Sequence, residues 1–549
     1  MRVFGFVVFV FLFTMGHSQA PQIERWDKRF GGSLADGVIN IIQIKQGGYI
    51  LFGEATSDIS GNKTEPNWDT TLSTADYWIV KIDAHGNQEW DKRFGGTSVE
   101  LSGMARQTKD GGYILGGISG SGIGGDKTQE GWGSYDYWIV KIDSAGNKQW
   151  DKDYGGPGED DLYDLQQTRD GGYILGGFSW SGAGGSKTQS NWDHSEQTVD
   201  FWIVKIDSVG NKKWDKRYGG NADDYFARII QTMDGGYLLG GSTESDSGDN
   251  VSMPARGKED AWFIKIDSIG NKQWDLRLGG TANTYSGGYP TIQTSDSGYI
   301  LACGSTSNIG GDKTENTYGD ADYWIVKIDA NGHKLWDKDF GGAQGDALTY
   351  LTKTLDGGYL MSGESHSPAG ADKTENNLGS QQIWMLKTDS LWRKEWDKTI
   401  FTTGGNDVGY AIQSDDNCYV AMVSTWAGTG GYKTQPNWDS TNLSGDFWVA
   451  KFCFNGYPEE INEVNNNIRI SVYPNPFCNE VDISIAKQDL HAASFSIYNV
   501  QGQAIYKREE DNLSPNYTKM LDLSYLPNGI YFVEVVVDGE RVVREVVKE

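Results

Sequence analysis

The chain has 549 residues, more than one ordinary hydrophobic core needs, so we expect more than one domain. Its formal net charge of −27 argues against nucleic acid and anionic membranes as partners, because such a surface repels phosphate groups. Cations, basic proteins and neutral glycans remain as candidates. The 73 glycines and the aromatic content of 13% favour many tight turns between aromatic strands.

The first residues have the pattern of a secretory signal peptide. Arg2 precedes an apolar run from Val3 to Phe13, and the small residues Gly16 and Ser18 follow before a predicted cleavage site. Residues 1–18 are therefore predicted to be a signal peptide. The apolar run is too short to span a bilayer and no later segment is long enough, so we expect no transmembrane anchor.

Between residue 26 and about residue 453 the chain repeats one unit seven times. The stretch Asp110–Gly156 is one copy, and successive copies lie about 60 residues apart, which is typical of an array of one supersecondary unit. A Gly-Gly-Tyr element, degraded in two copies, marks the units at Gly47–Tyr49, Gly111–Tyr113, Gly171–Tyr173, Gly235–Tyr237, Ser297–Tyr299, Gly357–Tyr359 and Asn417–Tyr419. A second marker is a tryptophan at Trp78, Trp138, Trp202, Trp262, Trp324, Trp384 and Trp448.

Each copy is predicted to contain four β-strands. In the second copy these lie at about Met104–Thr108, Tyr113–Ser119, Tyr137–Asp143 and Lys148–Tyr154, bounded by glycine, aspartate or asparagine. Tight turns join the first two and the last two strands, whereas a loop of about 17 residues joins the second to the third. No segment has a helical apolar period, so the fold is predicted to be all-β. Repeated four-stranded antiparallel units are typical of a β-propeller, here over residues 19–456.

The two ends of the array complement each other. The strand Trp26–Phe30 precedes the first copy, and the last copy, around Trp448, has no fourth strand after it. We therefore predict a seven-bladed β-propeller in which the N-terminal strand closes the last blade through main-chain hydrogen bonds. The repeated Lys-Ile-Asp and Gly-Asn signature before a tryptophan resembles the Trp-docking motif of quinoprotein-type propellers. This resemblance implies only the blade geometry, with the first strand innermost, and no quinone cofactor is expected.

Four cysteines are too few for a disulfide scaffold. Cys418 lies in the turn before the second strand of the seventh copy, and Cys453 ends its third strand. Because antiparallel neighbours bring these positions together, a Cys418–Cys453 disulfide is predicted, with two buried thiols as the alternative. Cys303 and Cys478 are expected to be unpaired.

The loops between the second and third strands (hereafter the long loops) are all expected on one face of the disc, which makes that face the better candidate for binding. Six of them share a Lys-Thr core. Five residues after the lysine stands Trp68, Trp132, Trp192, Tyr318 or Trp438, with Leu378 in the remaining loop. These five aromatic residues are candidate ligand-binding residues suited to stacking on sugars. The alternative is that each ring only fixes its loop onto the neighbouring blade.

The connections between blades carry an acid four residues after a Gly-Gly pair: Asp36, Glu100, Asp160, Asp224 and Asp346. Near the mouth of a central channel these carboxylates are candidate ligands for a hard cation, and calcium is the candidate cofactor. The alternative is that each acid accepts hydrogen bonds from turn N–H groups.

No nucleophilic or metalloprotease motif is present. The lysine that follows the marker tryptophan by three residues occurs in all seven copies, so we expect a cross-strand partner, such as the aspartate of the Trp-Asp pair, rather than catalysis. Pairs of acids are common in a chain with 75 Asp and Glu residues, so a glycosidase or lyase site stays open as an alternative.

After residue 456 the repeats stop. Residues 457–467 form a polar linker, and residues 468–549 show alternating strands with turn residues between them, which predicts a small β-sandwich of about seven strands. The segment closely resembles the type A C-terminal sorting domain of the Bacteroidetes type IX secretion system. The residues that carry the resemblance are Tyr473, Pro474, Asn475, Pro476, Gly502, Pro527, Asn528 and Gly529.

This resemblance implies two partners, an outer-membrane translocon and a sortase-like peptidase, and a secreted or cell-surface location. The chain as a whole resembles Bacteroidetes repeat β-propeller proteins exported in this way. We predict a monomeric, non-catalytic binding or adhesion propeller that recognises a glycan or protein through the long-loop face. A carbohydrate-active enzyme with acids on the same face, and a structural surface-layer protein, are the alternatives.

Overall fold

The computed structural model describes residues 22–453, apart from 46, 194–196, 286–289, 404–406 and 440–443, and residues 469–548, apart from 474–478, 488–489, 500–502, 512, 516 and 538–539. The chain divides into two compact units between Gly456 and Tyr457. The predicted signal peptide (1–18) and linker (457–467) lie outside the described residues. The described part is all-β, and it contains no helix long and apolar enough to cross a membrane.

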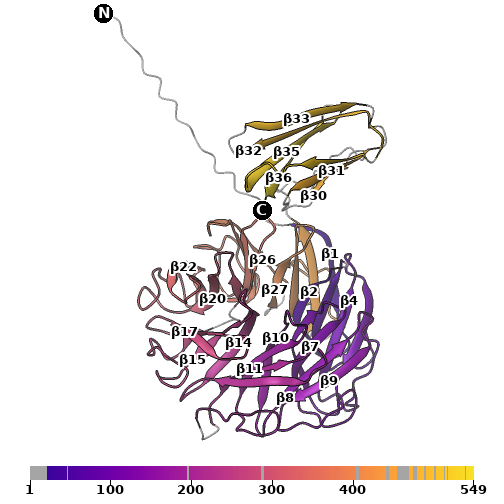
Figure 1. The fold of residues 1–549 in the computed structure, drawn as a ribbon. Coiled ribbons are helices and arrows are strands. Elements are labelled where there is room, and N and C mark those ends of the chain that lie inside the picture. The colour runs from indigo at the N-terminus through magenta and orange to yellow at the C-terminus, as the bar shows by residue number, and fades with distance from the viewer. Residues whose placement is uncertain are drawn as a thin grey trace, which may run out of the picture. The chain divides into compact units, whose positions relative to one another are not determined.

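The first unit consists of repeated antiparallel sheets (Figure 1), most of them built from four consecutive strands. Sheet 1 is β2 Asp36–Gln43, β3 Tyr49–Ala55, β4 Asp76–Ile82 and β5 Gln88–Phe94; sheet 2 is β6 Glu100–Gln107, β7 Tyr113–Ser119, β8 Asp136–Ile142 and β9 Lys148–Tyr154; sheet 3 is β10 Asp160–Gln167, β11 Tyr173–Ser179, β12 Asp200–Ile206 and β13 Lys212–Tyr218; sheet 4 is β14 Asp224–Gln231, β15 Tyr237–Thr243, β16 Asp260–Ile266 and β17 Lys272–Leu278. Sheet 5 is β18 Thr284–Tyr285 and β19 Thr291–Gln293, which both pair with β20 Tyr299–Ser305, then β21 Asp322–Ile328 and β22 Lys334–Phe340; sheet 6 is β23 Asp346–Lys353, β24 Tyr359–Ser365, β25 Gln382–Thr388 and β26 Lys394–Ile400; sheet 7 is β27 Asp407–Gln413, β28 Cys418–Thr425, β29 Asp446–Cys453 and β1 Gln22–Phe30.

The N-terminal strand completes sheet 7. β1 pairs antiparallel with β29, so that Trp26 lies opposite Lys451 and Phe30 opposite Phe447. In addition β2 of sheet 1 packs against β28 and β29, so the last sheet contacts the first. The strand predicted from Trp26–Phe30 therefore takes the place of a fourth strand, and the sheets form a closed series, which is consistent with a propeller.

Aromatic side chains hold neighbouring sheets together. The tryptophan of each third strand is fully buried and in most sheets packs on an aromatic ring of the preceding sheet. The centroid distances are 5.1 Å for Tyr77–Trp138, 4.8 Å for Tyr137–Trp202, 5.1 Å for Phe201–Trp262, 5.0 Å for Tyr323–Trp384 and 4.9 Å for Phe447–Trp78. Because each sheet is too small to bury its own faces, these inter-sheet contacts form the core.

The first strands are longer than the sequence predicts. In sheet 2 the prediction was Met104–Thr108, whereas β6 runs from Glu100 to Gln107 and contains a β-bulge between Ser102 and Met104. The bulge and the glycine at position 103 interrupt the alternating pattern, which hides the start of the strand. As a result the acid at position 100 is the first residue of a strand and not part of a free connection.

The repeated lysines of the third strands have a different partner from the one predicted. In six sheets the lysine pairs with an acid of the turn between the first and second strands, as in Lys141 with Asp110 at 3.0 Å and Lys205 with Asp170 at 3.0 Å. In sheet 1 Lys81 pairs with Glu89 at 2.8 Å. The aspartate of the Trp-Asp pair instead accepts the indole N–H of the third-strand tryptophan, as Asp151 does from Trp138 at 3.2 Å.

The structure joins Cys418 and Cys453 in a disulfide, with their Cα atoms 4.2 Å apart. The two residues lie opposite each other on β28 and β29. Cys303 is buried and free, and Cys478 lies outside the described residues.

The second unit has two antiparallel sheets that share one hydrophobic core. One consists of β30 Arg469–Tyr473, β31 Glu480–Ala486 and β34 Tyr517–Asp522; the other consists of β33 Ala504–Asp511, β32 Ala492–Asn499, β35 Gly529–Val537 and β36 Glu540–Lys548. Of the predicted sorting-signal residues, Tyr473 ends β30 and Gly529 starts β35, just after Pro527 and Asn528. Pro474, Asn475, Pro476 and Gly502 lie outside the described residues.

Candidate functional site

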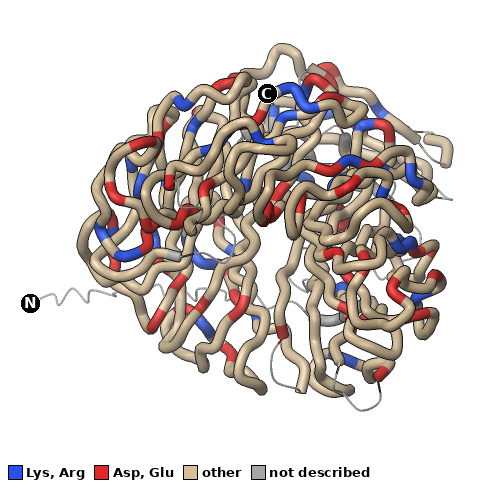
Figure 2. Tube along the Cα trace, turned by 90° about the horizontal axis from the view of Figure 1, so that it is seen from below, with Lys and Arg blue, Asp and Glu red and all other residues tan. Residues whose placement is uncertain are grey.

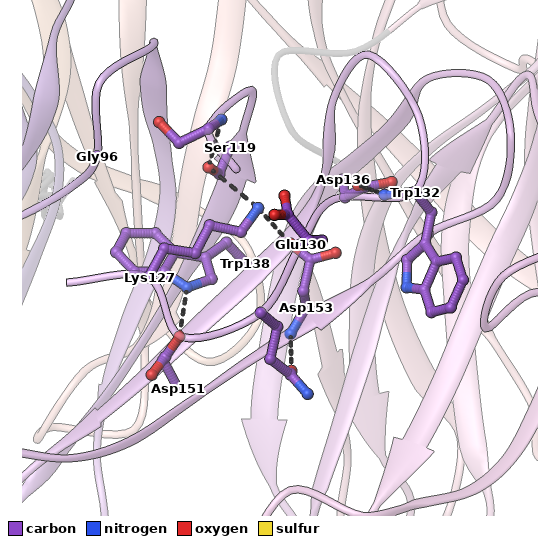
Figure 3. Close-up of polar contacts among 12 residues, drawn as sticks. Gly96, Ser119, Lys127, Glu130, Trp132, Asp136, Trp138, Asp151 and Asp153 are labelled. Carbon is purple, nitrogen blue, oxygen red and sulfur yellow. Dashed lines mark hydrogen bonds and ion pairs between the residues drawn. The ribbon is translucent and has the colours of Figure 1, made fainter. Parts of the chain in front are cut away.

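The long loops fold along the fourth strand of their own sheet. In sheet 2 the backbone N–H of Thr128 donates to Asp151 at 2.8 Å, and the hydroxyl of Thr128 donates to the same carboxylate at 2.9 Å. The buried Lys127 pairs with Asp153 of the fourth strand at 2.5 Å (Figure 3). The Lys-Thr core is therefore an anchor, and it covers an otherwise exposed edge strand.

Three of the predicted ligand-binding aromatics contact the next sheet in the series. The indole N–H groups of Trp68, Trp192 and Trp438 donate to Asp126, Asn250 and Asn62, at 2.9, 3.0 and 2.8 Å. An arginine of the fourth strand lies over each of these rings: Arg93 over Trp68, Arg217 over Trp192 and Arg29 over Trp438. These contacts fit the interpretation in which the rings fix the loops.

Trp132 and Tyr318 differ from these three because an aspartate replaces the arginine in their sheets, at Asp153 and Asp339. Trp132 is 56% exposed and Tyr318 55% exposed. In Figure 3 the indole of Trp132 points away from the Lys127–Asp153 pair. It lines a shallow cavity of about 500 Å³ together with Tyr154 and Lys212. Among the ring contacts of the described residues, none joins two of the five candidates, so the structure does not gather them into one site.

The five candidate calcium ligands, Asp36, Glu100, Asp160, Asp224 and Asp346, are buried at the first residue of separate first strands. Each accepts a hydrogen bond from the second glycine of the preceding Gly-Gly pair, as Glu100 does from Gly96 N–H at 2.8 Å. They are spread around the first unit, and among the described residues no group of three or more His, Cys, Asp or Glu is placed to hold a metal ion.

Each of these acids faces the acid that starts the third strand of the preceding sheet, across the interface between the two sheets. We call these five pairs of facing acids the carboxyl pairs. They are Asp446 with Asp36, Asp76 with Glu100, Asp136 with Asp160, Asp200 with Asp224, and Asp322 with Asp346. A Cβ added at Gly95 would lie 2.3 Å from Asp76 Oδ1 and 2.8 Å from Glu100 Oε2. The first glycine of the Gly-Gly pair is therefore required by the close approach of two carboxyl groups.

Burial makes these carboxyl groups weak acids. It raises the pKa of Asp36 and Glu100 to about 7 and that of Asp200, Asp346 and Asp446 to about 6. The neighbouring carboxylate of the pair raises the pKa of Asp36, Glu100 and Asp346 further. Within the described residues, one oxygen of both Asp200 and Asp224 is buried without a hydrogen-bond partner. One proton shared between the two carboxyl groups would give these buried oxygens a hydrogen bond.

A larger cavity, which we call the central pocket, lies where the first strands converge. Its volume is about 1090 Å³, and it is lined by β2, β6, β10, β14, β23 and β27 and by the ends of β3, β7, β11 and β15. Leu101, Asp161 and Tyr225, which line it, directly follow the buried acids that start their strands. The pocket therefore lies toward the end of the first unit that carries the inter-sheet connections and the starts of the long loops.

One wall of the central pocket is an aromatic platform formed by Tyr163, Phe178 and Tyr225. The ring centroids of Tyr163 and Phe178 are 5.0 Å apart, and those of Phe178 and Tyr225 are 5.4 Å apart. Tyr163 is 47% exposed and Tyr225 is 36% exposed, whereas Phe178 is buried beneath them. The plane of Tyr225 is nearly perpendicular to that of Phe178, at 88°, whereas Tyr163 is tilted by 33°, so each accessible ring is suited to stacking on its own apolar face of a ligand.

Three acids, Glu54, Asp161 and Glu259, also line the central pocket. Burial raises the pKa of Asp161 to about 7, with further contributions from Glu159 and Asp160, and it raises the pKa of Glu54 and Glu259 as well. Glu54 accepts a hydrogen bond from the backbone of Ser102 at 3.2 Å. One buried oxygen of Asp161 has no hydrogen-bond partner among the described residues.

The floor of the central pocket is polar. Arg106 donates to Asp164 at 3.0 Å, and Arg228 lies 3.7 Å from the other oxygen of the same carboxylate. The rings of Tyr350 and Tyr410 stack beside them, with centroids 4.9 Å apart. β-Bulges fall directly before Asp164, Arg228 and Tyr350, and a bulge re-aims the side chain that follows it.

These pocket residues do not belong to any of the repeated motifs of the sequence. One sign of the pocket in the sequence is that the second residue of the first strands varies from sheet to sheet. It is Gly37, Leu101, Asp161, Tyr225, Ala347 or Val408. In an array whose other strands are nearly identical, such variation marks positions that are not required by the fold.

Comparison with known proteins identifies the end of the chain. Residues 471–549 match the family model described as "Secretion system C-terminal sorting domain". This agrees with the resemblance seen in the sequence. The chain therefore carries a sorting tail for export by the type IX secretion system, to the cell surface or the surrounding medium.

No curated protein matches the chain. Among solved structures, BBS1N in complex with ARL6DN aligns with a TM-score of 0.39 and 7% identity, over 79% of this chain and 97% of that chain. Puromycin hydrolase aligns with 0.36 and 10%, over 72% and 52%. A mutant of the Synechocystis apocarotenoid oxygenase aligns with 0.36 and 10%, over 92% and 98%. Likenesses this weak carry no inference about activity.

Proposed function

We propose that the chain is an exported binding protein, a seven-bladed β-propeller that recognises a glycan without catalysis through the central pocket. The C-terminal unit is a small β-sandwich that serves as the sorting domain and is recognised by an outer-membrane translocon and a sortase-like peptidase. The proposal keeps the long-loop face predicted from the sequence but moves the binding residues from the long loops to the first strands.

The observation that carries this proposal is the aromatic platform of Tyr163, Phe178 and Tyr225 inside a cavity of about 1090 Å³. Sugar rings present an apolar face that stacks on aromatic rings and an edge of hydroxyl groups that pair with carboxyl groups. Glu54, Asp161 and Glu259 supply such carboxyl groups in the same cavity. A protein ligand is the other possible occupant, but a concave site of this size is more typical of small ligands.

Removal of the platform is expected to weaken binding strongly. Tyr163→Ala with Tyr225→Ala should weaken the affinity for a glycan found by array screening by about 30- to 150-fold, since each stacked ring contributes on the order of 1–1.5 kcal/mol. The measurement is isothermal titration calorimetry on the full chain. The matched control is Trp132→Ala with Tyr318→Ala, which removes two exposed rings outside the central pocket and should leave the affinity unchanged. If the control pair abolishes binding and the platform pair does not, the long loops bind the ligand instead.

A second candidate function is glycan cleavage, and Asp161 is the observation that favours it. An acid in a cavity with a pKa of about 7 and an unpartnered oxygen has the properties of a general acid. If the protein is an enzyme, Asp161→Asn should lower turnover of a bound polysaccharide at least about 100-fold while binding persists. Reducing-sugar release by the unmodified chain is the assay, and binding with no release supports the non-catalytic proposal.

A further inference from the structure

The central pocket combines a stacking surface with a floor that has excess positive charge. From this combination we propose that the pocket selects acidic sugars, with the ligand's carboxylate bound by Arg228 and its ring stacked on Tyr225. This inference rests on the proposed glycan-binding function and names the class of sugar.

The floor of the central pocket carries an excess of positive charge. Arg106 and Arg228 both line the pocket, and the carboxylate between them is that of Asp164. Two guanidinium groups with one carboxylate leave one positive charge facing the cavity. An anionic group on the ligand would neutralise it.

The hydrogen bonds show which arginine is available. Both oxygens of Asp164 are already used, because they accept the backbone N–H groups of Leu165 at 2.9 Å and Ile229 at 3.1 Å and the guanidinium of Arg106 at 3.0 Å. Arg228 stands 3.7 Å away, beyond hydrogen-bond distance, and among the described residues its guanidinium makes no hydrogen bond. A guanidinium has five N–H donors in a planar fork, which matches the two oxygens of a carboxylate.

The positions of Tyr225 and Arg228 fit the size of one sugar. Both belong to β14, and the bulge between Phe226 and Arg228 makes the strand advance by only about two residues between them, roughly 7 Å. A pyranose ring stacked on Tyr225 therefore has room to direct a carboxylate attached to the ring toward Arg228.

The pocket acids do not oppose this arrangement at mildly acidic pH. Burial raises the pKa of Asp161 to about 7, so this carboxyl group is largely protonated below that pH, and burial raises the pKa of Glu54 and Glu259 as well. The protonated Asp161 donates a hydrogen bond to a sugar oxygen and carries no repelling charge. Affinity for an acidic sugar should therefore rise as the pH falls from 8 to 6.

The test titrates the full chain with tetramers of galacturonate, glucuronate and mannuronate, each beside its carboxyl-reduced neutral counterpart. For at least one pair we expect the acidic tetramer to bind about tenfold or more tightly than the neutral one. The preference should shrink when sodium chloride is raised from 0.05 to 0.5 M, because salt screens the ion pair. A sulfated neutral tetramer tests whether the floor accepts any anion or requires a carboxylate.

Arg228→Gln should remove the preference for the acidic over the neutral tetramer, whereas Arg228→Lys should keep part of that preference. Arg169→Gln is the control, since Arg169 is an exposed arginine in the turn at the other end of the first strands. Equal affinities of acidic and neutral tetramers for the unmodified chain overturn this inference and leave the proposed function standing. Binding of neither kind, together with no hit on a wider glycan array, overturns both. The salt dependence needs no variant, so the inference stays testable if Arg228→Gln fails to fold.

Discussion

Deleting residues 21–32 is expected to lower the thermal unfolding midpoint by about 10 °C or more, because it removes the strand that closes the series of sheets. Trp26–Phe30 of β1 pairs with β29, and the side chain of Phe30 is buried in the core between sheets 7 and 1. Asp27 accepts the indole N–H of Trp448 at 3.0 Å and the backbone N–H of Thr434 at 2.8 Å. The deletion therefore breaks a main-chain ladder, exposes an apolar surface and releases a long loop at once.

Differential scanning calorimetry of the chain without residues 1–18, the predicted signal peptide, measures this effect. A synthetic peptide of residues 21–32, added in excess to the deleted chain, should restore part of the midpoint in a concentration-dependent way, because it binds only the folded form. A peptide in which Asp27 and Phe30 are replaced by alanine is the matched control and should not restore it. If the deleted chain melts at the original temperature, β1 does not close the series and the circular architecture proposed above is wrong.

The closure was predictable because it depends on counting. The sequence itself shows an additional strand at Trp26, before the first repeat, and a last repeat around Trp448 that lacks its fourth strand. Main-chain pairing between the two needs no knowledge of side-chain positions. The sorting domain was predictable for a related reason, since its motif lies in one continuous segment.

The central pocket could not be predicted, because its residues come from several sheets and meet only where the first strands converge. The bulges that re-aim Asp164 and Arg228 also break the alternation on which a strand prediction relies. The long loops show why a repeated residue is ambiguous. Their tryptophans recur at a fixed position, as a repeated binding site would, but Trp68, Trp192 and Trp438 also make the same anchoring hydrogen bond in each loop.

The carboxyl pairs give the second large expected effect, a loss of stability as the pH rises (Figure 2 shows acidic residues spread around the molecule). Folding raises the pKa of these acids, to about 7 for Asp36 and Glu100 and to about 6 for Asp200, Asp346 and Asp446. The native state therefore holds protons that the unfolded state has already released at pH 5. The stabilisation by these protons is fully present near pH 4, the ordinary pKa of these acids, and is lost as the pH rises through the folded pKa values to about 7. We expect the unfolding midpoint to fall over that range by about 10 °C.

Acids whose pKa is lowered by folding change the stability in the opposite sense, and they do so at lower pH. Asp234 and Asp296, which accept hydrogen bonds from neighbouring threonines and lysines, have a pKa of about 2 in the folded state. Their contribution is present above the ordinary pKa of an aspartate and is lost only in stronger acid. The two groups of acids together place the maximum of stability near pH 4, the ordinary pKa of a carboxyl group.

Asp200→Asn changes one carboxyl pair, and it also removes the negative charge that lies 3.8 Å from Arg217. Asp200 Oδ2 accepts the backbone N–H of Trp192 at 2.8 Å, which an asparagine oxygen also accepts, and the new amide N–H₂ faces Asp224. The chain already contains such a neutral partner, because Gln382 starts the third strand of sheet 6 where other sheets have aspartate. The substitution should stabilise the chain at pH 8 by about 1–2 kcal/mol, have little effect at pH 5, and so flatten the dependence on pH. Asp58→Asn, an exposed acid outside the pairs, should shift the curve at neither pH. Two outcomes would show that the pairs do not share protons: an unfolding midpoint that rises from pH 5 to pH 8, or a pH dependence of Asp200→Asn that is parallel to that of the original chain. A cation bound at the sheet interfaces would then explain the buried carboxyl oxygens better.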